Sequence, residues 1–85
     1  MVGALSDDAR VGATKRAIAR VLDRGEIEHG QLFEKVNTDV GSGKVIFEAA
    51  LNQMVGAHEV RKKRKEGSLR GRAYVLLESG RKWLS

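Results

Sequence analysis

The densest chemistry in this sequence is a run of basic side chains between Arg61 and Arg72. That stretch holds seven Lys or Arg residues and a single acidic residue. Residues 1–40 carry six basic and seven acidic side chains, whereas residues 41–85 carry ten and four. Positive charge concentrated in one segment indicates a polyanionic partner. The alternative interpretations are a solvated loop that keeps the protein soluble and, for residues 61–65, a signal for nuclear import.

Other candidate motifs lack the residues that their chemistry needs. The segment 40–44, VGSGK, resembles a phosphate-cradling loop, but Thr38 stands where the first glycine belongs and Val45 stands where a hydroxyl would bind Mg²⁺. His29 and His58 are isolated imidazoles in a sequence without cysteine, so we expect surface or capping roles rather than a metal site. No serine has a recognisable base and orienting group beside it. The sequence therefore predicts no enzyme, no cofactor and no metal.

A second group of polar side chains falls on one face of an expected helix, 43–55, for which Ser42 is a candidate N-cap. Lys44 and Asn52 share this outer face and can address phosphates or base edges. Glu48 on the same face can accept a hydrogen bond from cytosine N4, but elsewhere it would repel phosphates. The start of this helix can also hold one phosphate on its free N–H groups. The opposite face is apolar and comprises Ile46, Phe47, Ala50, Leu51 and Met54.

Hydrophobic periodicity predicts the elements that carry these residues. The helical period extends over 7–24, with Ser6 as N-cap and Gly25 as C-cap, and a short strand or loop follows at 26–28. A short helix is expected from His29 or Gly30 through Val36, and Asn37-Thr38-Asp39 reads as a polar turn. After Gly56 the period changes to two, which predicts strands at 58–65 and 72–77, a hairpin tip at 66–71 and a last helical turn at 79–84.

Length and composition fit one small domain spanning 1–85. Hydrophobic residues make up 41% and charged residues 32% of the chain, as in an ordinary folded protein. We find neither an apolar run long enough for a membrane span nor a signal-peptide pattern at the start. Trp83 is expected to pack on the first helix, with a dimer contact as the alternative. The side chains expected to form one core are Ile18, Leu22, Phe33, Ile46, Ala50, Met54, Val60, Tyr74 and Leu76.

The order of these elements resembles the winged helix-turn-helix superfamily over nearly the whole chain. Residues 31–36, QLFEKV, followed by 37–41 and the helix from Ser42, are similar to its helix-turn-helix. Residues 51–56, LNQMVG, resemble the exit from the second of these helices into a basic strand. Residues 74–81, YVLLESGR, are similar to the Tyr-x-Leu-Thr-x-x-Gly-Arg stretch that ends the wing in many bacterial and archaeal regulators, with Leu77 in place of Thr.

The resemblance implies an α+β fold: three helices, a C-terminal β-hairpin wing and a short terminal helix. It also implies that the helix at 42–55 lies in the major groove of double-stranded DNA while the wing contacts the backbone beside it. Because a wing cannot face the duplex from both sides, we expect three to four of its cations to contact phosphates. Arg16 and Arg20 are further candidates for backbone contacts. The residues predicted to bind DNA are Ser42, Lys44, Glu48, Asn52, Arg61, Lys62, Lys63, Arg64, Lys65, Arg70 and Arg72.

The function expected from these features is duplex DNA binding in a small transcriptional regulator or an accessory factor for replication or recombination. Such a protein would be cytoplasmic and associated with the nucleoid. Two alternatives remain open at this point: a winged helix that contacts a protein partner in a larger assembly, and a protein that binds structured RNA. The chain lacks a long C-terminal helix, so we expect a monomer or a weak homodimer.

Overall fold

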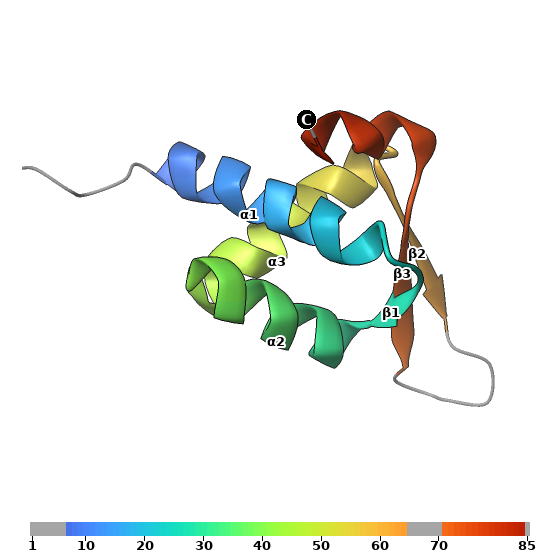
Figure 1. Cartoon of the computed structure of the whole chain (residues 1–85), viewed down its shortest axis with the longest axis horizontal. Helices are drawn as coiled ribbons and strands as arrows, with labels where there is room; N and C mark the ends of the chain where they lie inside the picture. The colour runs from blue at the N-terminus through green and yellow to red at the C-terminus, as the bar shows by residue number, and fades with distance from the viewer. Residues whose placement is uncertain (1–6, 65–70, 85) are drawn as a thin grey trace, which may run out of the picture.

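The computed structural model describes residues 7–64 and 71–84 of the chain. Within these ranges it is a small α+β protein with four helices and a three-stranded antiparallel sheet (Figure 1). The order is the one expected from the sequence. The elements are α1 (Asp7–Leu22), β1 (Ile27–Glu28), α2 (His29–Val40), α3 (Gly43–Gly56), β2 (Val60–Arg64), β3 (Arg72–Leu76) and the 3₁₀ helix η1 (Glu78–Leu84).

The sheet gathers at one end of the helices, beyond the end of α1 and beside the start of α2 (Figure 1). Its strand order is β1-β3-β2, so the strand that follows α3 lies at an edge. The hairpin formed by β2 and β3 is antiparallel, with Val60 opposite Leu76 and Arg64 opposite Arg72. The expected tip at 66–71 falls largely outside the described residues, as does the expected cap Ser6.

One hydrophobic core joins the three long helices to the sheet. The interior residues Ile18, Ala50 and Met54 are fully buried. Most of the expected core residues belong to this cluster or pack against its edge. Ile46 is an exception, because it is only half-buried and lies outside the cluster. Its place in the interior is taken by its neighbour Phe47, which is 1% exposed.

The prediction of a turn at Asn37-Thr38-Asp39 is wrong, because α2 continues to Val40. The three polar side chains are exposed, while Val36 and Val40, four residues apart, face the core. A polar stretch on the solvent side of a helix carries the same residues as a turn, so composition alone misled the prediction. The helix instead ends at Gly41, which has the left-handed φ of 62° and donates its N–H to the Asn37 carbonyl.

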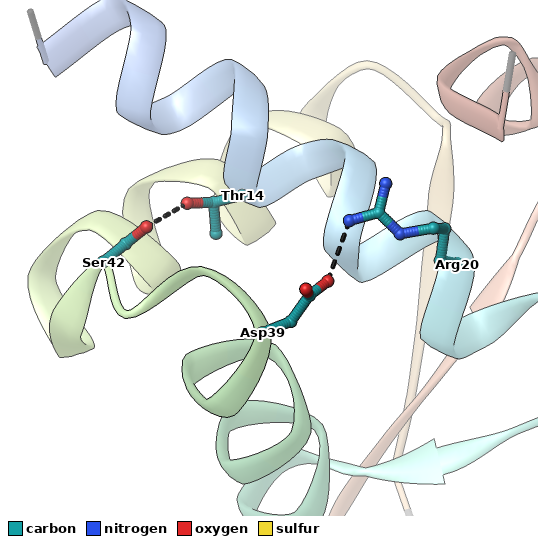
Figure 2. Close-up of polar contacts among 4 residues, drawn as sticks. All are labelled: Thr14, Arg20, Asp39 and Ser42. Atoms are coloured by element: carbon teal, nitrogen blue, oxygen red, sulfur yellow. Dashed lines mark hydrogen bonds and ion pairs between the residues drawn. The ribbon is translucent and has the colours of Figure 1, made fainter. Parts of the chain in front are cut away.

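Ser42 precedes α3 as expected but does not cap it through its side chain. Its backbone is helical, and the free N–H of Gly43 is bound instead by the Asn37 side-chain oxygen at 3.1 Å. The Ser42 hydroxyl lies 2.7 Å from the hydroxyl of the buried Thr14 on α1 (Figure 2). Because Thr14 gives its proton to the Arg10 carbonyl, Ser42 is the donor of this pair.

A second polar contact fixes the same junction of α2 and α3 against α1. Arg20 on α1 forms an ion pair with Asp39 near the end of α2, with 2.8 Å between guanidinium nitrogen and carboxylate oxygen (Figure 2). The two contacts bracket the α2–α3 junction, so they hold the start of α3 at a defined place against α1.

The chain leaves α3 by a left-handed residue, but that residue is His58 rather than Gly56. His58 has a φ of 59°, and the N–H of Glu59 returns to the Met54 carbonyl. This geometry satisfies carbonyls at the end of α3, as a left-handed cap does. The strand expected from residue 58 therefore begins only at Val60.

The remaining differences in element bounds are small. The first helix ends at Leu22 instead of Arg24, because Arg24 and Gly25 donate to carbonyls only three residues back. The return strand ends at Leu76 instead of Leu77, and the last helix begins at Glu78. Among the described residues, no helix has both the length and the apolar character needed to cross a bilayer.

Candidate nucleic-acid interface

The basic residues of the hairpin lie on two different faces of the sheet. Residues directly opposite each other on antiparallel strands point to the same side, and successive residues alternate. Lys62 faces Tyr74 in the register and Arg64 faces Arg72, so all four share the face of the buried Val60. This is the face that packs on the helices. We call Lys62, Arg64 and Arg72 the inner-face cations.

The other two basic residues of β2, Arg61 and Lys63, are the outer-face cations. They pair with Val75 and Ala73 and therefore point away from the helices. The ammonium of Lys63 lies 3.0 Å from a carboxylate oxygen of Glu26, in the segment that leads into β1. Lys63 is thus partly neutralised within the protein.

Among the residues that the structure describes, the inner-face cations have no such acidic partner. Their side chains are exposed, and across residues 7–64 and 71–84 no carboxylate lies within ion-pair distance of them. Three like charges at one end of a strand pair repel each other, so this arrangement does not serve the stability of the hairpin. It leaves a positive surface available to a partner.

A histidine and a tyrosine connect this surface to α3. His29, the first residue of α2, has its Nδ1 3.0 Å from the hydroxyl of Tyr74 on β3. The imidazole also packs edge-on against the ring of Phe47 on α3, with 5.6 Å between ring centroids. His29 is half-buried by these contacts, so it is neither a free surface residue nor a cap. The start of α2, the middle of β3 and the first turns of α3 therefore meet at one point.

The pKa values of His29 and Tyr74 reflect the charged side chains around this pair. Burial lowers the pKa of the His29 imidazole, and the positive charges of Arg72 and Lys44 lower it further while Glu48 opposes them. Burial also raises the pKa of the Tyr74 phenol, against the effect of the neighbouring Arg72. Lys44 and Glu48 on α3 thus act on the same groups as Arg72 on β3. The His29 ring, which contacts Phe47 of α3 and Tyr74 of β3, therefore lies between the charges of α3 and those of the hairpin.

The structure brings together some of the residues predicted to bind DNA and separates others. Lys44, Glu48 and Arg72 lie around the His29–Tyr74 pair, and Lys62 and Arg64 share the face of Arg72. Asn52 is exposed two turns further along α3. The members that lie apart are Ser42, bound to Thr14, and the outer-face cations, while Lys65 and Arg70 lie outside the described residues.

The two cations of α1 that were candidates for backbone contacts, Arg16 and Arg20, differ in their own contacts. Arg20 is engaged by Asp39, on the side where α1 meets α2. Arg16 is exposed on α1. Trp83 packs near α1, as expected, with the Lys15 ammonium 5.2 Å from the centre of its ring.

A hollow of about 520 Å³ opens on another part of the surface, between the end of α1 and α2. Its lining includes Arg20 and Glu26, which are already paired with Asp39 and Lys63. Arg24 and Lys35 also line the hollow, and the described residues show no ion pair with either of them. Among the described residues, no group of three or more His, Asp or Glu is placed to hold a metal ion.

Sequence reasoning missed the role of His29 and Tyr74. Their separation of 45 residues gives no local signal, and only the pairing of Ile27 with Tyr74 brings β1 and the start of α2 to β3. Comparisons with models of protein families, with curated proteins and with solved structures find no match to this chain.

Proposed function

We propose that this protein is a winged helix-turn-helix protein that binds double-stranded DNA. In this proposal α2 and α3 are the helix-turn-helix, α3 enters the major groove, and β2 with β3 is the wing that lies on the adjacent backbone. The observation that carries it is that His29 contacts both Phe47 of α3 and Tyr74 of β3, which bears the inner-face cation Arg72 two residues away. One polyanion could contact α3 and the inner-face cations at once, and its phosphates would provide the negative charge that the described residues do not place beside these cations.

In this proposal the cations contact phosphates, and other side chains of α3 contact the bases. The inner-face cations and Lys44 are suited to phosphates, since they are exposed and the described residues show no ion pair with them. Asn52 and Glu48 project from α3, where they would reach base edges, and an amide can bind adenine with two hydrogen bonds. Arg61 and Lys63 would stay on the far side of the wing. In this proposal the wing would make three phosphate contacts through the inner-face cations, and Lys44 would add a fourth from α3.

A protein partner is the second candidate, and α3 itself favours it. The exposed face of α3 carries only one cation, Lys44, beside Glu48 and the apolar Val45. An acidic protein surface could meet the inner-face cations and tolerate Glu48 better than phosphates do. Structured RNA is less suited to this geometry, because the deep and narrow major groove of an A-form helix does not admit α3.

The test is a titration of labelled duplex DNA, duplex RNA and single-stranded DNA with the full chain at two salt concentrations. Each neutralised phosphate contributes about 0.9 to the salt slope on B-DNA. Three to four contacts therefore predict that affinity for duplex DNA falls about 40- to 150-fold between about 50 mM and about 200 mM salt. Duplex DNA should bind more tightly than the other two. Absence of binding to any nucleic acid at low salt would overturn the proposal in favour of a protein partner.

A further inference from the structure

The side chain of α3 that points most directly away from the core is Val45. Successive residues of an α-helix are about 100° apart, so Val45, Ala49 and Asn52 form the midline opposite the buried Ala50 and Met54. Val45 is 80% exposed, and it is the exposed large hydrophobic residue of the part of the chain that the structure describes. Lys44 and Glu48 lie to one side of this midline, toward the hairpin.

Folding does not explain a valine at this place. Its side chain contributes little packing, and a β-branched residue is a weaker helix former than the alanine found one turn later. Isolated apolar side chains are common on protein surfaces, so exposure alone carries little weight. The position of Val45 is stronger evidence, because the midline of α3 is the part that would lie deepest in a groove.

We propose that Val45 determines sequence specificity by packing against the C5-methyl group of a thymine in the major groove. This inference rests on the proposed function. Among the base edges of the major groove, thymine alone offers an apolar group, whereas the other positions offer donors and acceptors. A DNA duplex is therefore a partner that satisfies both features of this surface: phosphates for the inner-face cations and a methyl group for the valine.

The neighbours of Val45 fit this assignment. Ala49 is short, so one turn further along the midline no side chain holds the helix away from the groove floor. The Glu48 carboxylate can accept from the amino groups of cytosine or adenine, but it would repel the O6 and N7 acceptors of guanine. Glu48 thus favours a cytosine or an adenine beside it, and the short Ala49 leaves room for a thymine methyl against Val45.

The experiment removes the methyl group from the DNA and the valine from the protein. Duplexes that the full chain prefers are selected from a randomised pool, and each thymine is then replaced singly by uracil, which lacks only the methyl. For the wild-type chain we expect at least one replacement to weaken binding about fourfold, the effect of one buried methyl-sized group. Val45→Ala should weaken binding to the thymine duplex by a similar factor and should show no further loss with uracil at that position.

Gln53→Ala is the matched control, because Gln53 is also exposed on α3 but lies to the side of the midline away from Lys44. It should keep the full difference between thymine and uracil. Thermal unfolding of both variants checks that the fold is unchanged. Tight duplex binding with no sensitivity to uracil at any position overturns the inference and leaves the proposed function standing. Failure of the wild-type chain to bind any duplex overturns both.

Discussion

The two ends of the hairpin differ in whether their charged side chains have partners of opposite charge. At the base, Glu59 is only 5% exposed, and its carboxylate accepts from the Trp83 indole at 2.9 Å and the Lys82 ammonium at 2.8 Å. Toward the tip, Arg64 and Arg72 are exposed side by side, and the described residues place no carboxylate against them.

This difference separates the charges that hold the fold from those that remain for a partner. A buried carboxylate is costly unless it is paired and hydrogen-bonded, so the base has its partners within the chain. Adjacent guanidinium groups repel each other, so their placement adds no stability to the free protein. Changes at the base should therefore alter stability, and changes toward the tip should alter binding.

The largest effect on stability is expected for Gly80→Ala at the base. A Cβ at this position would overlap the Glu59 carbonyl oxygen and the Leu76 side chain. Overpacking of this kind typically costs about 1–3 kcal/mol of the free energy of unfolding. The Gly-Arg pair of the resemblance thus has a structural reason here, since Gly80 packs closely and Arg81 pairs with Asp23 at 3.0 Å.

Denaturant unfolding measures this effect, with Gly12→Ala as the control. Gly12 lies inside α1, and an added Cβ there meets nothing within 4 Å. Because alanine is the better helix former, the control should be stabilised by about 0.5–1 kcal/mol. An equal change in the free energy of unfolding of the two variants would show that the base is not tightly packed around Gly80.

A smaller effect is expected for Glu59→Gln, and it should depend on pH. Burial alone would raise the pKa of the Glu59 carboxyl, but the hydrogen bonds from Lys82 and Trp83 outweigh it, so the pKa lies below its ordinary value. The unfolded chain then takes up a proton first as the pH falls. The stabilisation by Glu59 is therefore present above the ordinary carboxyl pKa and lost as the pH falls through the folded value.

The free energies of unfolding of the wild type and the Gln variant should differ by about 1 kcal/mol at neutral pH, the typical net contribution of one hydrogen bond. The difference should shrink under acidic conditions. A difference that stays constant from neutral to acidic pH would contradict the role of the charge.

The smallest effect concerns His29, which reports the positive potential near the inner-face cations. Its folded pKa is lowered, so the unfolded chain binds the proton more readily and stability falls as the pH drops below the ordinary imidazole value of 6.5. His29→Gln should remove this part of the pH dependence. In the wild type, NMR titration of the imidazole should give a higher pKa once duplex DNA is added, because phosphates would offset Arg72 and Lys44. An unchanged pKa would place the nucleic acid elsewhere.

The order of the elements could be predicted from the sequence because the hydrophobic period differs between helices and strands. Some element bounds could not. Asn37, Thr38 and Asp39 suit a turn and the solvent-exposed side of a helix equally well. After α3, the residue with a left-handed φ is His58, although the glycine at position 56 adopts that conformation more readily. Such choices depend on which carbonyls need a partner, which composition does not reveal.

The candidate site was predictable as a set of residue types but not as a surface. The density of cations between residues 61 and 72 is visible in the sequence. Which of them face α3 depends on the strand register, and the pairing of Lys63 with Glu26 joins residues 37 positions apart. The sequence therefore treated Lys63 and Arg64 alike, whereas the fold turns them to opposite faces.

The most direct test of the account compares two double variants of the same strand. Lys62→Ala with Arg64→Ala removes two inner-face cations, and Arg61→Ala with Lys63→Ala removes both outer-face cations, so the net charge changes equally. The inner-face variant should bind duplex DNA more weakly, with a salt slope reduced by about 1.8. The outer-face variant should keep the affinity and slope of the wild type, and both should unfold within about 0.5 kcal/mol of it. Equal losses in the two variants, or a larger loss on the outer face, would contradict the assignment of the inner face and α3 as the binding surface.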